Sequence, residues 1–542
     1  MTTATLTGTG VLTRFFLRRE RIALIFWLLG GTFVYYSQAV GVDLAYPTQA
    51  DLDRVAASMQ GNAAMVAMAG PPRVLDTIGG QVAFQASAFG MIVAGLMSMF
   101  LVGRHTRANE ESGRDELIRS GVVGRHAAFT GASLVTVLAN LVYGLAVALS
   151  LISYGLPVAG SIALGVGATC AGLVFMAFAL LAAQLTESTR AVYGITGAAI
   201  AVAYVLRAVG DVGNGVLSWL SPLGWGQAMR PYDGEVWWPA LLSLAVAVAI
   251  TLVARRVLDH RDFGAGVLPP RPGPARAGES LRSAFGLAWR LQRGSLIGWS
   301  IGMLLAGLAF GSIGDDVGDL LGDVDLAELL RQDVGSLVDA FYAMSAGLLA
   351  LIGSAYTISA GRRPRAEEAA GRVEPLLSTD LPRLRWLAGH LVIMLAGSAV
   401  VLALGGFGMG LMYGVMTGDM SQLLPLLGAS LTYLPAVWVL GGITVVLFGF
   451  LPPATVGAWI ALAFCFVVLM FGATLKFPDW LMSISPFDNI PLVPAVDFAP
   501  GAGVDHRGRR TGSVCGGRVG FPAPGYRDQL IRHRRSAPGR FP

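Results

Sequence analysis

The ten residues Arg107-Ala108-Asn109-Glu110-Glu111-Ser112-Gly113-Arg114-Asp115-Glu116 return in pattern as Arg365-Ala366-Glu367-Glu368-Ala369-Ala370-Gly371-Arg372-Val373-Glu374. Both runs read Arg-x-x-Glu-x-x-Gly-Arg-x-Glu, and they lie 258 residues apart. The same offset continues through Ser120 and Ser378, Arg125 and Arg383, and Gly131 and Gly389. Similarity at a long fixed period predicts two related structural units in tandem.

Two further pairs of segments support this repeat. At an offset of 272, Arg18, Arg21, Trp27 and Gly30 match Arg290, Arg293, Trp299 and Gly302. At an offset of 264, Ser221-Pro222-Leu223 matches Ser485-Pro486-Phe487. A longer loop after the first apolar run of the first half explains why the offsets differ.

The composition places these units in a lipid bilayer. The chain has 542 residues, of which 54% are hydrophobic and only 13% are charged. Soluble domains carry about 25% charged residues, and a helix crosses the hydrocarbon core with about 20 apolar residues. Continuous apolar runs of that length predict spans at 22–42, 81–102, 127–152, 158–184, 190–210, 236–256, 295–312, 340–361, 385–415, 424–451 and 453–473.

The arginines predict the orientation of these spans. They concentrate before the first span, between the second and third spans, and after the sixth span, whereas the alternate loops carry few. Because basic residues stay on the cytoplasmic side, we expect a multi-pass protein of the bacterial inner (plasma) membrane with a cytoplasmic N-terminus. We expect the first apolar run to be an uncleaved span and not a signal peptide, because it is too long and lacks a small-residue cleavage site.

The predicted fold is an all-α polytopic membrane protein built from two parallel six-helix repeats. The first repeat covers 1–256, a proline-rich cytoplasmic linker covers 257–279, and the second repeat covers 280–497. Six spans per repeat is an even number, so both repeats enter the membrane in the same sense. Segments 8–21 and 280–293 have an apolar face and predict amphipathic helices in the membrane interface.

The repeat predicts a twelfth span near 500–520, and the sequence does not provide it. Residues 501–510 read Gly-Ala-Gly-Val-Asp-His-Arg-Gly-Arg-Arg, and the Arg-rich tail 498–542 stays polar to its end. We interpret the twelfth helix as missing or altered. The alternative is an eleven-span protein with a polar tail.

The repeated charged runs are the first candidate site. Their positions are Arg107, Glu110, Gly113, Arg114, Glu116, Arg365, Glu368, Gly371, Arg372 and Glu374. A short charged cytoplasmic helix can dock on a partner protein through charge-assisted bonds, and a glycine lets its backbone turn. A solvated loop with topogenic arginines explains the arginines, although it does not explain glutamates and a glycine at fixed spacing in both halves.

The chain has no phosphate-binding loop of its own. Lys476 is the only lysine, and it lies in Thr-Leu-Lys-Phe instead of following a glycine-rich loop. If ATP drives the protein, another polypeptide binds it.

These motifs resemble the double-length permeases of actinobacterial ATP-binding-cassette exporters, of the tetronasin, polyketide-antibiotic and multidrug efflux type. The resemblance covers about residues 9–497 and rests on the segment before the first span, the repeated charged runs and Ser-Pro-Leu-Gly-Trp at 221–225. It implies coupling helices at 104–125 and 362–385 that contact two copies of a separate ATPase subunit. It also implies that this partner binds ATP and Mg²⁺, and that the chain exports lipophilic small molecules without being an enzyme itself.

Aromatic and methionine side chains in the first two spans are the second candidate site. Trp27, Tyr35, Tyr36, Phe89, Met91 and Met97 can line an adaptable apolar cavity for substrate, or they can simply pack against lipid and other helices. The alternative functions are an ion-coupled secondary transporter and a non-transporting membrane scaffold. No carboxylate is centred in a span, which argues against ion coupling. The arginines lie at span ends and form no contiguous patch, which argues against a nucleic-acid partner, and no residue spacing suggests a bound metal or cofactor.

Overall fold

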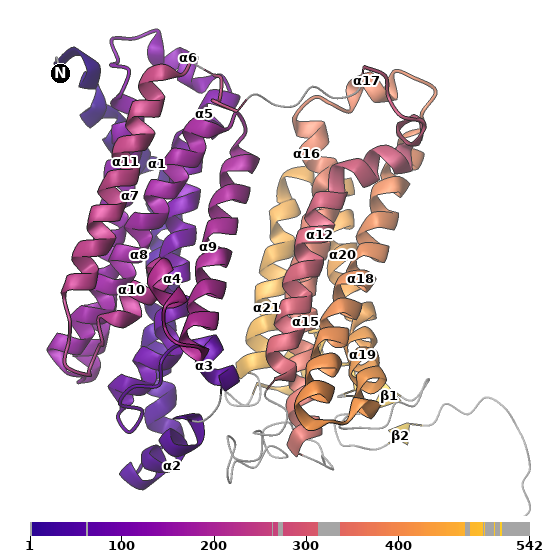
Figure 1. Ribbon diagram of the computed structural model, residues 1–542. Helices are drawn as coiled ribbons and strands as arrows, with labels where there is room; N and C mark the ends of the chain where they lie inside the picture. Colours follow the sequence, from indigo (N-terminus) through magenta and orange to yellow (C-terminus); the bar gives the residue numbers. More distant parts are fainter. Residues whose placement is uncertain are drawn as a thin grey trace, which may run out of the picture. The chain divides into compact units, whose positions relative to one another are not determined.

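The structure is a computed structural model that describes residues 3–60, 63–262, 264–268, 275–312, 337–471, 477–491, 493, 503–504 and 510–511. Its contacts divide the chain into two compact units, which separate after Arg282 (Figure 1). The described part of the predicted linker 257–279 therefore belongs to the first unit. Most of the predicted tail 498–542 and the expected twelfth span lie outside the described residues.

Unit 1 is a helical bundle. Its elements are η1 (Thr3–Leu6), α1 (Thr9–Ala45), α2 (Gln49–Gln60), α3 (Ala63–Ala69), α4 (Ile78–His105), α5 (Arg107–Glu111), α6 (Arg114–Arg119), α7 (Ala127–Tyr154), α8 (Val158–Leu185), α9 (Thr189–Val212), η2 (Leu217–Leu220), α10 (Pro222–Ala228), α11 (Trp238–His260) and η3 (Glu279–Arg282).

Unit 2 is also helical apart from two short strands. Its elements are α12 (Ala284–Gly311), α15 (Leu337–Gly361), α16 (Arg363–Ala369), α17 (Glu374–Leu377), α18 (Arg383–Thr417), η4 (Met420–Gln422), α19 (Leu423–Thr432), α20 (Leu434–Phe450), η5 (Pro452–Val456), α21 (Gly457–Phe471), α22 (Asp479–Met482), β1 (Gly503–Val504) and β2 (Arg510–Thr511).

Eleven helical stretches within the described residues are long and apolar enough to cross a membrane, which confirms the predicted polytopic all-helical fold. They run Thr9–Ala45, Ile78–Glu111, Ala127–Tyr154, Val158–Leu185, Thr189–Val212, Trp238–His260, Ala284–Gly311, Val338–Ala369, Arg383–Thr417, Met420–Phe450 and Pro452–Met470. Each overlaps one predicted span. The tenth stretch is divided into α19 and α20, because Pro435 stands at the start of α20 and cannot donate the hydrogen bond that would continue the helix.

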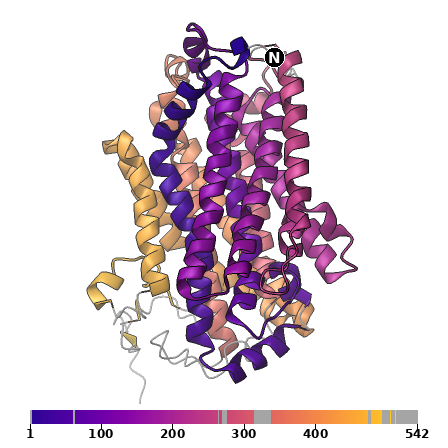
Figure 2. The same ribbon diagram turned by 90° about the vertical axis from the view of Figure 1, so that its left-hand side faces the viewer.

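The buried helix of unit 1 is α8, which packs against α4, α7 and α11. In unit 2, α18 packs along α12 and also contacts α15 and α19. Leu223 is fully buried in unit 1, and its repeat counterpart Phe487 is buried in the core of unit 2. At the two ends of unit 1 lie α5 with α6 and, opposite them, α2 with α3 (Figure 1); the first of these is called the α5 end below. Figure 2 turns the indigo-to-magenta helices of unit 1 toward the viewer.

The predicted interfacial helices are not separate elements. Residues 9–21 continue into the first span as one 37-residue helix, since the segment has no proline and its one glycine, Gly10, lies in the first turn. At about 1.5 Å per residue it is about 55 Å long, which exceeds the hydrocarbon core of about 30 Å. Leu12 and Phe16 pack against Ala127, Ala132 and Val135 near the start of α7, so only part of the expected apolar face stays exposed. In unit 2, α12 begins at Ala284 and likewise runs directly into its span.

The predicted coupling helices 104–125 and 362–385 are each broken into two short helices. Gly113 separates α5 from α6 with φ +68°, and Gly371 separates α16 from α17 with φ +67°. A right-handed helix cannot pass through a positive φ, so a turn forms at both glycines. Their amides donate to Glu110 O at 3.1 Å and Glu368 O at 2.9 Å, respectively. The two repeat copies therefore share one local backbone conformation.

This conformation predicts the cost of adding a methyl group at either glycine. A Cβ on Gly113 or Gly371 meets nothing within 4 Å, so Gly113→Ala and Gly371→Ala carry only the backbone cost of a positive φ. We expect each to lower the free energy of unfolding by about 1–2 kcal/mol. Gly30→Ala is the matched control, because it also meets no atom within 4 Å but lies inside α1, where alanine is favoured by up to about 1 kcal/mol. Thermal unfolding of the purified chain in detergent measures all three, and equal melting temperatures would contradict the shared turn.

Candidate functional site

The five-residue helix α5 is the point where the charged run meets the membrane helices of unit 1. The preceding helix α4 ends at His105, because Thr106 leaves the helical region with φ −113° and ψ −93°. The Thr106 hydroxyl donates back to Val102 O at 2.7 Å and caps that end. The chain then restarts as α5, whose successive side chains point in different directions.

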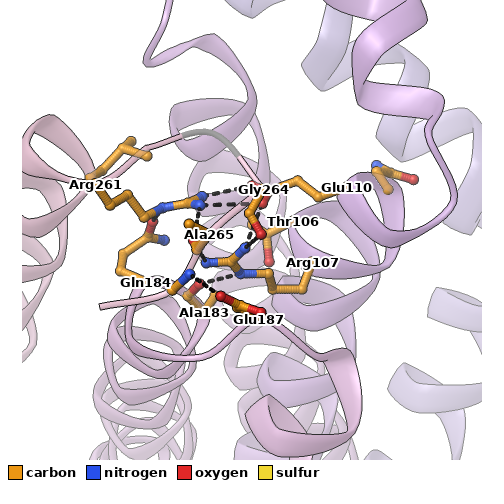
Figure 3. Close-up of polar contacts among 12 residues, drawn as sticks. Thr106, Arg107, Glu110, Ala183, Gln184, Glu187, Arg261, Gly264 and Ala265 are labelled. Atoms are coloured by element: carbon orange, nitrogen blue, oxygen red, sulfur yellow. Dashed lines mark hydrogen bonds and ion pairs between the residues drawn. The ribbon is translucent and has the colours of Figure 1, made fainter. Parts of the chain in front are cut away.

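Arg107 joins α5 to the end of α8. Its side chain is fully buried, and Nε donates to Ala183 O, near the last turn of α8, at 2.5 Å. Its Nη2 donates to Ala265 O at 2.8 Å (Figure 3). Carbonyls at the C-terminal end of a helix carry a partial negative charge, so a buried guanidinium is stabilised there.

Glu110 joins α5 to the end of α11. One carboxylate oxygen pairs with Arg107 Nη1 at 2.7 Å and the other with Arg261 Nη2 at 2.7 Å (Figure 3). Arg261 follows the last residue of α11, and its Nε donates to Gln184 Oε1 at 2.8 Å. The Glu110 side chain is only 10% exposed, so a single carboxylate holds two largely buried cations together.

Asn109 and Glu111 join α5 to two more helices. Arg19 of α1 donates to Asn109 Oδ1 at 3.0 Å. The two Glu111 oxygens accept from the amide and hydroxyl of Thr189, at 2.9 and 2.6 Å. Thr189 is the first residue of α9, where a carboxylate interacts favourably with the helix dipole.

Another ion pair, in which the glutamate is buried and the arginine is partly exposed, joins α1 to the C-terminal end of α4. Glu20 is 1% exposed, and its Oε2 pairs with Arg104 Nη1 at 2.7 Å. Its other oxygen lies 3.4 Å from His105 Nε2, and the His105 ring stacks on Phe16 with centroids 4.2 Å apart. The contacts of α5 and Glu20 together fix α1, α4, α8, α9 and α11 to one another at the α5 end. We call them the α5 knot: Arg19, Glu20, Arg104, Arg107, Asn109, Glu110, Glu111, Gln184, Thr189 and Arg261.

The start of the chain between the two repeats is held in the same place. Leu268 N donates to Leu185 O at 2.9 Å, and Val267 N donates to Gln184 O at 3.3 Å. A Cβ on Gly266 would lie 2.8 Å from Leu185 O, so the backbone of this segment passes very close to the end of α8. Residues 264–268 are thus part of unit 1 and not a free linker.

Among the described residues, the ionic contacts of the corresponding segment of unit 2 lie mostly within that segment. Glu367, the counterpart of Asn109, pairs with Arg363 at 2.7 Å and with Arg372 at 2.7 Å. The hydrogen bond from Arg372 to Glu367 raises the pKa of Arg372, so that guanidinium stays charged. Glu368, the counterpart of Glu110, pairs at 2.7 Å with Arg383 at the start of α18. Arg372 and Arg383 are 60% and 69% exposed, so these pairs are far less enclosed than those of Glu110.

The structure divides the ten predicted contact residues into four groups. Arg107 and Glu110 point inward and bond to other groups of unit 1. The prediction that they contact a partner protein is therefore wrong in this conformation. Arg114, Glu116, Arg372 and Glu374 are exposed, and Gly113 and Gly371 form the turns. Arg365 and Glu368 are partly buried.

Sequence reasoning missed the acceptors and partners that complete the knot. Asn109 and Glu111 lie inside the charged run but outside its repeated pattern, and Arg261 had served only as an indicator of topology. Glu20 carried a signal of its own, because it is an acidic residue among Arg18, Arg19 and Arg21. Its partner could not be named without the packing of α1 on α4.

Most of the predicted cavity residues are packing residues. Tyr35, Met91 and Met97 are buried in the core of unit 1, and Trp27 stacks on Phe100 with centroids 5.9 Å apart. Tyr36 makes an edge contact with Tyr154. Phe89 lines a pocket of about 440 Å³ between α1, α3 and α4, and its predicted role in binding substrate stays a prediction.

The α5 knot predicts a large difference between two glutamates six residues apart. Glu110→Gln removes the only acidic partner that the contacts described above give to Arg107 and Arg261, so we expect it to destabilise unit 1 by about 3–5 kcal/mol. Glu116→Gln changes an exposed side chain and should stay within about 0.5 kcal/mol of the parent chain. Thermal unfolding in detergent compares the two variants. Melting temperatures that fall equally would refute the buried role of Glu110.

Comparison with known proteins places this architecture in a family. Residues 281–505 match the family described as "Multidrug efflux system permease Rv1217c, C-terminal domain". The whole chain is similar to the "Multidrug efflux system permease protein Rv1217c" of Mycobacterium tuberculosis (strain ATCC 25618 / H37Rv). The two are 41% identical over 497 residues, which cover 91% of this chain and 90% of that protein. Similarity of this extent, over a bundle with eleven candidate spans, shows that the chain belongs to the family of multidrug efflux permeases that Rv1217c represents.

Proposed function

We propose that this permease is the membrane-spanning subunit of an ATP-driven exporter of lipophilic compounds. In this proposal two copies of a separate ATPase subunit bind ATP and Mg²⁺ on the cytoplasmic side of the plasma membrane. They dock on the two segments 104–125 and 362–385, and the N-terminus lies on the same side. The distribution of arginines supports this orientation, because the α5 end carries Arg14, Arg18, Arg104, Arg114 and Arg125.

The observation that carries the proposal is the division of the charged run into an outer face and an inner knot. The outer face of the first segment presents Arg114, Glu116, Leu117 and Val122, with Leu117 and Val122 exposed by 77% and 89%. Exposed leucine and valine beside alternating charges suit a protein interface, whose core is apolar and whose rim is charged. The second segment presents Arg372, Glu374 and Leu384 in the same way.

The inner knot gives such an interface a mechanical consequence. A displacement applied to α5 acts directly on α1, α8, α9 and α11 through these contacts, of which those to α8 and to the end of α11 are buried. Buried, mutually bonded charges resist separation, because breaking one pair leaves an uncompensated charge in a poorly solvated place. A partner that moves α5 would therefore move these helices together, as a transport cycle requires.

Charge reversal on the outer face tests the docking role. We expect Glu116→Arg combined with Glu374→Arg to reduce ATP-dependent dye transport by about tenfold or more, because like charges placed across an interface cost several kcal/mol. Transport is measured in inverted membrane vesicles that contain the permease and its ATPase. The control is Asp53→Arg, which reverses an exposed carboxylate on α2 at the opposite end of unit 1.

The same vesicles separate this proposal from ion-coupled transport. Export driven by ATP persists after a protonophore collapses the ion gradients and stops when ATP is withdrawn. The opposite pattern, or full transport by the double variant, would reject ATPase docking on these segments. A purified complex with one ATPase per permease chain would reject the proposed two copies.

A further inference from the structure

A pocket is lined by residues of α1, α3 and α4. Of these helices, α3 lies at the end of unit 1 opposite to the α5 end (Figure 1). The pocket measures about 440 Å³, within the range of about 300–1,000 Å³ that is usual for small-molecule sites. Its lining includes Val34, Gln38, Met65, Met68, Gln85 and Phe89. None of the residues lining it carries a charge, and all of them belong to unit 1.

Two glutamines of the lining belong to a directed chain of amides. Gln38 Nε2 donates to Gln85 Oε1 at 2.7 Å, and Gln85 Nε2 donates to Gln81 Oε1 at 2.9 Å. Gln81 is fully buried and donates to Leu75 O at 2.7 Å. A backbone carbonyl can only accept, so Leu75 O fixes the direction of the whole chain. At its pocket end, Gln38 keeps a carbonyl oxygen and a second N–H available, and Gln85 keeps a second N–H.

The anchor of this chain is a strained loop. Val74 has φ +48°, a conformation that is a true outlier for a β-branched residue. Thr77 stabilises this conformation of Val74, because its amide and hydroxyl donate to Val74 O at 3.2 and 3.0 Å. Gly80 closes over the same carbonyl, where a Cβ would lie only 1.8 Å from the oxygen. Strain of this kind persists where the surroundings enforce it and often marks a functional site.

The wall formed by α3 is also fixed by polar groups. Arg207 of α9 is fully buried, and its Nη2 donates to Ala67 O at 2.7 Å and to Met68 O at 3.0 Å. Tyr204 donates to Met68 O at 2.8 Å, and its ring lies 4.6 Å from the Arg207 guanidinium carbon. The arginine thus caps the last carbonyls of α3 and holds Met65 and Met68 against the pocket.

The chain of three amides does not recur at the equivalent positions of the second repeat. At the offset of 258, Gln81, Gln85 and Phe89 correspond to Asp339, Ala343 and Gly347, and at the offset of 272 Gln38 corresponds to Phe310. The neighbouring positions Ser87 and Ser345, and Gly95 and Gly353, do match. The repeated fold therefore does not need the amide chain, although glutamine is costly in a membrane helix.

We propose that this pocket binds an uncharged lipophilic compound that carries a hydrogen-bonding oxygen, and that Gln38 and Gln85 select it. Methionine and phenylalanine side chains adapt to apolar ligands of different shape, while the free amide groups bind a carbonyl or hydroxyl oxygen. A cationic compound finds no carboxylate in the lining. The inference rests on the proposed function, because it assigns a substrate class to an exporter.

Equilibrium binding to the full chain in lipid nanodiscs tests the site, with empty nanodiscs subtracted. The probes are the neutral dye Nile red and the cationic dye rhodamine 6G. Val34→Phe fills the pocket and should weaken Nile red binding at least tenfold. Gln38→Leu removes the terminal amide and should weaken it by about tenfold, the equivalent of one hydrogen bond. The matched control is Leu29→Phe on the same helix, at a position that is 66% exposed, and it should bind like the parent chain.

The expected pattern is saturable Nile red binding that both pocket variants weaken and that excess rhodamine 6G does not displace. The proposal would be rejected if Val34→Phe and Gln38→Leu bound Nile red as well as Leu29→Phe does. Displacement of Nile red by rhodamine 6G would also reject it. Melting temperatures of all three variants show that the comparison is made on folded protein; if Val34→Phe does not fold, Gln38→Leu decides. ATP-dependent transport by the parent chain is measured separately, so its failure would count against the exporter while the binding result still judged the pocket.

Discussion

The physical constraint on which unit 1 depends is the placement of four polar side chains on one short helix. Arg107, Asn109, Glu110 and Glu111 of α5 bind α8, α1, the end of α11 and the start of α9, respectively. Apolar helices have little hydrophobic reason to associate within lipid, so specific packing and polar contacts must define their arrangement. These polar contacts lie at one end of unit 1. The opposite end, which contains α2, α3 and the pocket, is held by separate contacts of Arg207 and by the amide chain.

The two charged segments share a backbone conformation but differ in their side-chain contacts. Gly113 and Gly371 turn with the same φ, and Ser120 and Ser378 donate to Glu116 O and Glu374 O in the same way. The side chains diverge: Glu110 is enclosed between two cations, while Glu368 meets an exposed arginine. The two charged segments therefore share a local backbone shape, while each makes its own contacts with neighbouring helices.

Much of the fold was predictable because the bilayer imposes a simple rule. Each backbone polar group must be satisfied within the membrane, so about 20 apolar residues in a row predict a helix wherever they occur. Eleven spans were identified in this way, and the fixed spacing of glycines in the two charged runs indicated a turn. The interfacial helices failed as separate elements, because amphipathic patterning does not reveal whether a helix continues into the next span. The coupling helices were not single helices, because Gly113 and Gly371 adopt a positive φ. Glycine can adopt either sign of φ, so the sequence alone does not specify which one occurs.

The sequence by itself determined that the chain is a polytopic helical membrane protein whose only lysine does not follow a glycine-rich loop. It also predicted two related halves, each with a charged segment after its second span. These properties follow from composition and spacing, which are local. Only the tertiary structure decided that Arg107 and Glu110 face inward while Glu116 faces outward, that Tyr35, Met91 and Met97 pack in the core, and that Gln38, Gln81 and Gln85 join in one chain. The reason is that burial and hydrogen bonding join residues up to about 160 positions apart, such as Glu110 and Arg261, and no local pattern specifies which partner a side chain will meet.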